Sequence, residues 1–202
     1  MFGLVAWMVL ILYLWLLVWA TKRGWRWGVE KKGWTGKKRY LGAAFGFLIV
    51  YLPVFWDWLP TVAVHQYYCA KDSGFWVYKS LDQWKVENPG VMETLVANKG
   101  APSKRQGDMK NYTDTYFLNS RFNWVVKHNG KFLFNRWRHE QEVVDTKTNT
   151  VLARYVDYST SQERQQAGWS GWKDWLARGH CSDGELHQGL MYEFEHSIRG
   201  AE

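Results

Sequence analysis

The sequence has few cysteines and lacks the short motifs that mark common catalytic and nucleotide-binding sites. Its 202 residues include only two cysteines, with no C-x-x-C pair. No H-E-x-x-H, no G-x-S-x-G and no phosphate-binding glycine loop is present. These absences exclude the recognised spacings of zinc proteases, α/β-type serine hydrolases and P-loop enzymes. The sequence names no reaction, and we expect no cofactor and no bound metal.

Two long stretches lack charge entirely. Residues 2–20 and 40–56 contain no Lys, Arg, Asp or Glu. About 20 apolar residues in a helix cross a hydrocarbon core of about 30 Å, so we predict transmembrane helices over about 2–20 and 40–59, with Asp57 at the membrane edge. A signal peptide is the alternative for the first run, but no basic residue precedes it and no A-x-A-like cleavage site follows. A buried core helix is the alternative for the second.

The segment between these runs is strongly basic. Residues 21–40 hold one acidic residue, Glu30, and carry the chain's whole net charge of +7, so the remainder has none. This distribution argues against nucleic-acid binding by the large domain. Short basic loops stay in the cytoplasm, and basic groups attract anionic lipid heads. The basic residues of the predicted loop 21–39 are Lys22, Arg23, Arg26, Lys31, Lys32, Lys37, Lys38 and Arg39.

This topology predicts two parts. Residues 1–59 form a two-helix membrane anchor, and residues 60–202 form an α+β domain outside, which in a bacterium is the periplasm. The two cysteines, Cys69 and Cys181, both fall in the external domain, and an oxidising compartment favours their pairing. Two unrelated buried thiols are the alternative.

Small residues in the second apolar run point to close helix packing. Gly42 and Gly46 are four residues apart, a spacing that lets another helix approach. We expect the first helix to be that neighbour, and a homo-oligomer is the alternative. Pro53 is expected to kink the outer end of the helix.

The start of the external domain has weaker signals. We predict a turn at residues 72–74, a strand over 75–81, a short helix over 91–98 and an exposed loop over 98–111, which is polar and rich in turn-forming residues.

Residues 116–159 have the clearest strand pattern and predict an antiparallel meander of three to four strands. Asn129-Gly130 is typical of a two-residue type I′ turn, and a second turn is expected at 145–150. The first hairpin would then place one group of residues on a single face: Phe122, Trp124, Val126, Leu133 and Trp137. In the second, Val143, Leu152 and Val156 would share one side, opposite Val144, Val151 and Tyr155.

The C-terminal region predicts short helices. Trp169, Trp172 and Trp175 recur every third residue, which indicates an amphipathic helix that Gly179 would end. Residues 184–198 fit either a helix or a last strand.

Two groups of residues are candidates for chemistry. Glu140 and Glu142 share a strand face with Arg138, and paired carboxylates perform acid–base work when their pKa values differ; a solvated, charge-balanced face is the plainer interpretation. The second group resembles a metal site or a Cys–His nucleophile: His180, Cys181, Asp183, Glu185 and His187. A disulfide at Cys181 would exclude both uses, so we expect a structural cysteine and assign no catalytic residue. His65 and Asp57 are ionisable groups near the outer membrane surface.

The stretch "VVDTKTNTVLARYVDYST", preceded by "RWRHEQE", resembles a segment of uncharacterised proteobacterial inner-membrane proteins that have two transmembrane helices and an external β-rich domain. The resemblance covers residues 136–160 and implies a bacterial source, with no known activity. We therefore expect a non-enzymatic, membrane-anchored periplasmic module that binds another envelope protein. The alternatives are a membrane-tethered periplasmic enzyme and an oligomeric pore or transporter subunit.

Overall fold

The computed structural model describes residues 2–132, 134, 136–160 and 173–199. The chain divides into two compact units, Met1–Leu59 and Pro60–Glu202, which are described separately. The fold is of the α+β class, with an antiparallel sheet in the second unit.

The first unit is a pair of helices joined by a short helical connection. Helix α1 spans Phe2–Arg26, followed by one turn of π-helix, η1, at Trp27–Lys31. A 3-10 turn, η2, at Gly36–Lys38 leads into α2 at Arg39–Phe55. By length and composition, both helices are apolar enough to cross a membrane. The helices do not coincide with the predicted spans, since α1 continues to Arg26 and α2 ends at Phe55, four residues before residue 59.

Small residues hold the two helices together. A Cβ atom built at Gly42 would overlap the backbone oxygen of Gly24, and one at Gly46 would overlap that of Ala20. The backbones therefore approach more closely than any side chain allows. Farther along the pair, Tyr13 donates a hydrogen bond to the backbone oxygen of Val50, at 3.4 Å.

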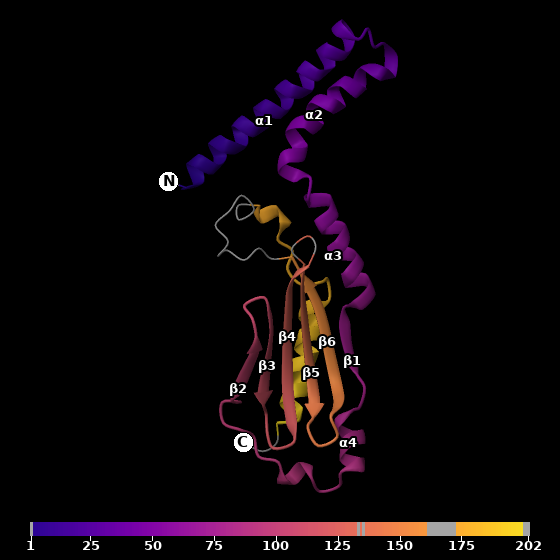
Figure 1. The fold of residues 1–202 in the computed structure, drawn as a ribbon. Coiled ribbons are helices and arrows are strands. Elements are labelled where there is room, and N and C mark those ends of the chain that lie inside the picture. Colours follow the sequence, from indigo (N-terminus) through magenta and orange to yellow (C-terminus); the bar gives the residue numbers. More distant parts are fainter. Residues whose placement is uncertain (1, 133, 135, 161–172, 200–202) are drawn as a thin grey trace. The chain divides into compact units, whose positions relative to one another are not determined.

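The second unit is built around one six-stranded sheet (Figure 1). Its strands run in the order β1-β6-β5-β4-β3-β2, and every neighbouring pair is antiparallel. The strands are β1 Gly74–Val77, β2 Ser103–Gly107, β3 Asn111–Phe117, β4 Phe122–Phe132, β5 Arg136–Asp145 and β6 Thr150–Ser159. The antiparallel sheet is confirmed and is larger than the predicted meander.

Helices flank this sheet. Helix α3 spans Trp58–Asp72 and runs into β1, and the C-terminal helix α5 spans Gly184–Ser197. Figure 1 shows α5 behind the sheet, and it contacts β6 and β1. The described residues of this unit also form the short helices α4 Leu81–Glu87, η3 Met92–Thr94 and η6 Asp174–Leu176.

The hydrophobic core lies between one sheet face and the helices. Phe122, Val143 and Tyr155 bring β4, β5 and β6 into a buried cluster with Trp84 of α4 and Met191 of α5. The predicted assignment of residues to the two sheet faces was therefore wrong for Val143 and Tyr155, which were expected on opposite faces but lie in the same core cluster. The register shifts between Val143 and Val144, so strict alternation fails there.

The predicted turn at Asn129-Gly130 is also wrong. Strand β4 continues to Phe132, and Asn129 pairs with Arg138. A Cβ at position 130 would overlap the ring of Trp137, so this glycine makes room for a cross-strand tryptophan. The second turn was predicted correctly, because β5 ends at Asp145 and β6 begins at Thr150.

Other predictions need correction. Residues 98–111 were expected to be a loop, yet they contain the exposed strand β2. The predicted helix over 91–98 is only the 3-10 turn η3, and the predicted strand over 75–81 stops at Val77. In the C-terminal region, residues 184–197 form a helix, while Trp169 and Trp172 lie outside the described residues.

Candidate functional site

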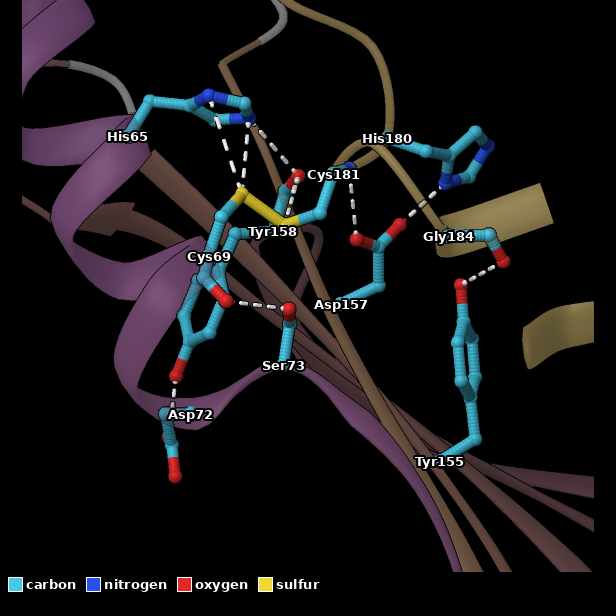
Figure 2. Close-up of a disulfide and its surroundings, with 10 residues drawn as sticks. All are labelled: His65, Cys69, Asp72, Ser73, Tyr155, Asp157, Tyr158, His180, Cys181 and Gly184. Atoms are coloured by element: carbon cyan, nitrogen blue, oxygen red, sulfur yellow. Dashed lines mark hydrogen bonds and ion pairs between the residues drawn. A yellow bond between two sulfur atoms is a disulfide. The ribbon is translucent and has the colours of Figure 1, made fainter. Parts of the chain in front are cut away.

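Helix α3 places a histidine and a cysteine on the same face. His65 and Cys69 are four residues apart, so their side chains lie one turn from each other. His65 is buried, with its Nε2 atom 3.2 Å from the backbone oxygen of Tyr158 on β6. The Cys69 sulfur lies 3.6 Å from Nε2 and 3.9 Å from Nδ1 of the same ring (Figure 2).

The second cysteine comes from the other end of the unit. The structure joins Cys181 to Cys69 by a disulfide across 112 residues of sequence (Figure 2). Before it, Thr160 and Arg178 form an isolated antiparallel bridge, which brings the chain back beside β6. The bond therefore fastens α3 to the segment that leads into α5.

A buried carboxylate holds the Cys181 segment in place. Asp157 of β6 is fully buried, and its Oδ1 accepts a hydrogen bond from the backbone N–H of Cys181 at 3.0 Å. Its Oδ2 contacts Nδ1 of His180 (Figure 2). Helix α5 begins at Gly184, whose added Cβ would lie 2.7 Å from Cβ of His180. Asp157 thus sits beside the positive end of the α5 dipole.

Tyr158 extends the site to the opposite face of β6. Its hydroxyl donates a hydrogen bond to Oδ2 of Asp72, at 2.5 Å, and accepts one from Nε of Arg138. Burial, followed by the bond to Asp72, raises the pKa of Tyr158 to about 12. The tyrosine is therefore a neutral hydrogen-bonding group at physiological pH.

A cavity of about 620 Å³ lies beside the disulfide. Residues of α3, including His65 and Cys69, line one side, and Arg178, Cys181 and His187 are among those on the other. Both cysteines of the disulfide line this cavity. A disulfide in such a place can exchange with an incoming thiolate or, once reduced, offer two sulfur ligands.

The C-terminal candidates are separated rather than gathered. Cys181 is bonded to Cys69, His180 contacts Asp157, and only Asp183 and His187 share the cavity with Cys181. Glu185 is exposed on α5 and does not border the cavity. The histidine beside the disulfide is His65, a residue that the sequence marked only for its place near the membrane. The H-x-x-x-C spacing of His65 and Cys69 could have indicated that the two side chains are close, but only if residues 58–72 were known to be helical.

The paired glutamates lie on one face, where they join a network of ion pairs. Glu140 is buried and contacts Lys127, Arg138 and Arg154, and Glu142 also pairs with Lys127. Burial alone would raise the pKa of Glu140, but its hydrogen bond with Glu142 and the three cations lower it to about 2. A carboxylate this acidic stays ionised at neutral pH and cannot act as a general acid.

A row of partly buried polar groups crosses the other face of the sheet. Nδ1 of His128 lies 2.8 Å from Nδ1 of His139, and Nε2 of His139 lies 2.9 Å from Oγ of Ser159. The row has no signal in the sequence, because the three residues belong to three strands and meet only through the register. Burial, with a contribution from His128, lowers the pKa of His139 to about 4.

The predicted basic loop is largely helical and carries aromatic contacts. The guanidinium of Arg39 lies over the ring of Trp25, and the ammonium of Lys32 lies over Trp27, at 5.1 and 5.4 Å from the ring centres. Arg23 lines an otherwise apolar groove of about 320 Å³ between α1 and α2. Lys22 and Arg26 border a second groove, of about 330 Å³.

Comparisons of the chain with protein-family models, with curated proteins and with solved structures found no match.

Proposed function

We propose that this chain is a non-enzymatic, membrane-anchored interaction module of a bacterial envelope complex. Helices α1 and α2 anchor it in the inner membrane, with the basic segment 21–39 in the cytoplasm against anionic lipid heads. Residues 60–202 lie in the periplasm and bind another envelope protein. The open edge of the sheet at β2 is the observation that carries the binding role.

Strand β2 offers a free backbone edge. Among the described residues it pairs only with β3, and all five of its residues are exposed. The backbone N–H of Phe117 bonds to the oxygen of Pro102, and that of Asp108 bonds to the oxygen of Asn111. Because bonded and non-bonded pairs alternate in an antiparallel ladder, Ser103 and Arg105 direct their backbone groups outward. An extended segment of a partner can add a strand at such an edge.

The charge around β2 favours an acidic partner segment. Residues 98–111 contain Lys99, Lys104, Arg105 and Lys110 against one acidic residue, Asp108. Arg105 is held in place by two 2.7 Å bonds to Asp114. Complementary charge raises the rate of encounter and fixes the register of the added strand.

The placement of the domain is tested by thiol labelling in intact spheroplasts. An impermeant maleimide should label Cys69 and Cys181 only after reduction, since the external domain would hold them as a disulfide. Labelling that occurs only after membrane lysis, with a denatured sample as the control for buried thiols, would place the domain in the cytoplasm and contradict the proposal.

The binding role is tested by photo-cross-linking in cells. A photoreactive residue at Lys104 should yield a defined cross-linked protein, whereas the same residue at the exposed Glu87 of α4 should not. Ser103→Pro removes an outward N–H without removing a bond to β3, so it should abolish the cross-link from Lys104. Ser103→Ala is its matched control and should leave the cross-link intact. Equal cross-linking in the two Ser103 variants would refute binding at this edge.

A further inference from the structure

Three potential metal ligands meet at the disulfide. Among the described residues, the ligand atoms of His65, Cys69 and Cys181 lie within 4.8 Å of one another. In the oxidised chain each sulfur is bonded to the other. Reduction would turn this one bond into two free sulfur ligands beside an imidazole.

The surroundings of His65 select one ring nitrogen for a metal. The oxygen of Tyr158 can only accept a hydrogen bond, so Nε2 at 3.2 Å carries the proton and donates it. Nδ1 then has the free lone pair. Metal-bound histidines usually donate their other N–H to a carbonyl or a carboxylate, which fixes the ring and the tautomer. The backbone oxygen of Tyr158, on β6, accepts this hydrogen bond from His65.

The distance between the Cys69 sulfur and the His65 ring also suits two ligands of one zinc ion. Zn–S bonds of about 2.3 Å and Zn–N bonds of about 2.0 Å in a tetrahedron place sulfur and nitrogen about 3.5 Å apart. Nδ1 of His65 already lies 3.9 Å from the Cys69 sulfur. The two sulfurs would have to separate, and the cavity that borders both cysteines provides the space.

We propose that reduction of the Cys69–Cys181 disulfide creates a Zn²⁺ site formed by the two thiolates and Nδ1 of His65, with the fourth position facing the cavity. A dithiol of the oxidoreductase class supplies two electrons and two protons and becomes a disulfide, while the Cys69–Cys181 bond breaks to give two thiols. Zn²⁺ then displaces both thiol protons. Two thiolates neutralise the ion, so the site adds no net charge next to the buried Asp157.

The test uses the purified full-length chain in detergent, with Co²⁺ as a spectroscopic probe. After anaerobic reduction by a phosphine, we expect one Co²⁺ per chain, a thiolate-to-cobalt charge-transfer band and loss of that band when Zn²⁺ is added. Zn²⁺ binding to the reduced chain should also release two protons at a pH where both thiols are protonated. The oxidised chain should show neither signal. A reduced chain without the band, or an oxidised chain that has it, would overturn the proposal.

Variants locate the site. His65→Gln can be purified in the oxidised form and then reduced, and it should bind Co²⁺ at least about tenfold more weakly. His196→Gln, on the exposed side of α5, is the matched control and should bind like the wild type. Zn²⁺ should raise the unfolding temperature of the reduced wild type more than that of reduced His65→Gln. Equal affinity in the two histidine variants would exclude His65 as a ligand and overturn the proposed site.

Discussion

At the scale of single residues, Asp145 ties the end of β5 to α4 and to the turn that precedes β4. It is buried at the end of β5 and accepts bonds of 2.7 and 2.8 Å from Arg121 and one of 2.8 Å from Nε1 of Trp84 in α4. Burial acts to raise the pKa of Asp145, but these bonds outweigh it and the pKa is lowered. The ionised carboxylate is therefore part of the folded structure.

Asp145→Asn should lower the free energy of unfolding by about 3–5 kcal/mol, because it leaves the buried Arg121 without its counter-charge. Urea unfolding at neutral pH measures the loss. Glu87→Gln, which breaks the more exposed pair with Lys79, is the control and should change stability by less than about 1 kcal/mol. A loss of equal size in both variants would contradict the role assigned to Asp145.

His139 should make stability depend on pH between about 6.5 and 4. Its pKa in the folded chain is about 4, below the ordinary value of 6.5, so the unfolded chain takes up a proton first as the pH falls. The contribution of the neutral ring is complete above pH 6.5 and is lost as the pH falls through 4. His139→Gln should flatten this part of a plot of unfolding free energy against pH, whereas His196→Gln should not. Direct NMR titration giving His139 a pKa near 6.5 would refute the assignment.

At the scale of elements, the contact between α1 and α2 depends on missing side chains. Gly46→Val should push the helices apart, since its Cβ alone would overlap the Ala20 backbone. Spin labels at Leu16 and Leu52 should report a longer and broader distance distribution. Ala44→Val introduces the same side chain at an exposed position on the same helix and should leave the distribution unchanged. An unchanged distance in Gly46→Val would show that the helices do not pack through this face.

The elements that sequence predicted well have strong, continuous signals. The two uncharged runs identified α1 and α2, but their ends were missed because Lys and Arg are good helix formers and extend α1 to Arg26. Strand β2 was missed because Ser103–Gly107 has no alternating apolar residues. Helix α4 was missed although Ser80 and Gln83 form a capping box, a pattern readable from sequence.

The candidate site was predictable only in part. Two cysteines in one predicted compartment suggested the pair Cys69 and Cys181. His65 was not connected to them, because its four-residue spacing from Cys69 brings the two together only if residues 58–72 are helical. The burial of Asp157 could not be read from "YVDYS", since β6 has buried residues on both of its faces from Tyr155 onward. Contacts set by register and by packing between distant elements have no local signature.

At the scale of the whole molecule, the disulfide closes a loop of 112 residues. In the chain-entropy description, a loop of this length contributes about 4–5 kcal/mol by restricting the unfolded chain. The double variant Cys69→Ala, Cys181→Ala should therefore unfold at a lower urea concentration than the oxidised wild type. The reduced wild type without metal should behave like the variant. A midpoint unchanged in both would show that the bond adds no stability.

The position of the bond also determines how the molecule would respond to pulling. All six strands lie between Cys69 and Cys181 in sequence. Tension applied between α2 and α5 would pass along α3, through the two sulfurs and directly into the C-terminal segment. The sheet, which lies within the covalently closed loop, would then carry none of the applied force. Reduction would transfer the load to β1 and β6, so the redox state of two sulfur atoms would decide whether a force applied through α3 can unfold the sheet.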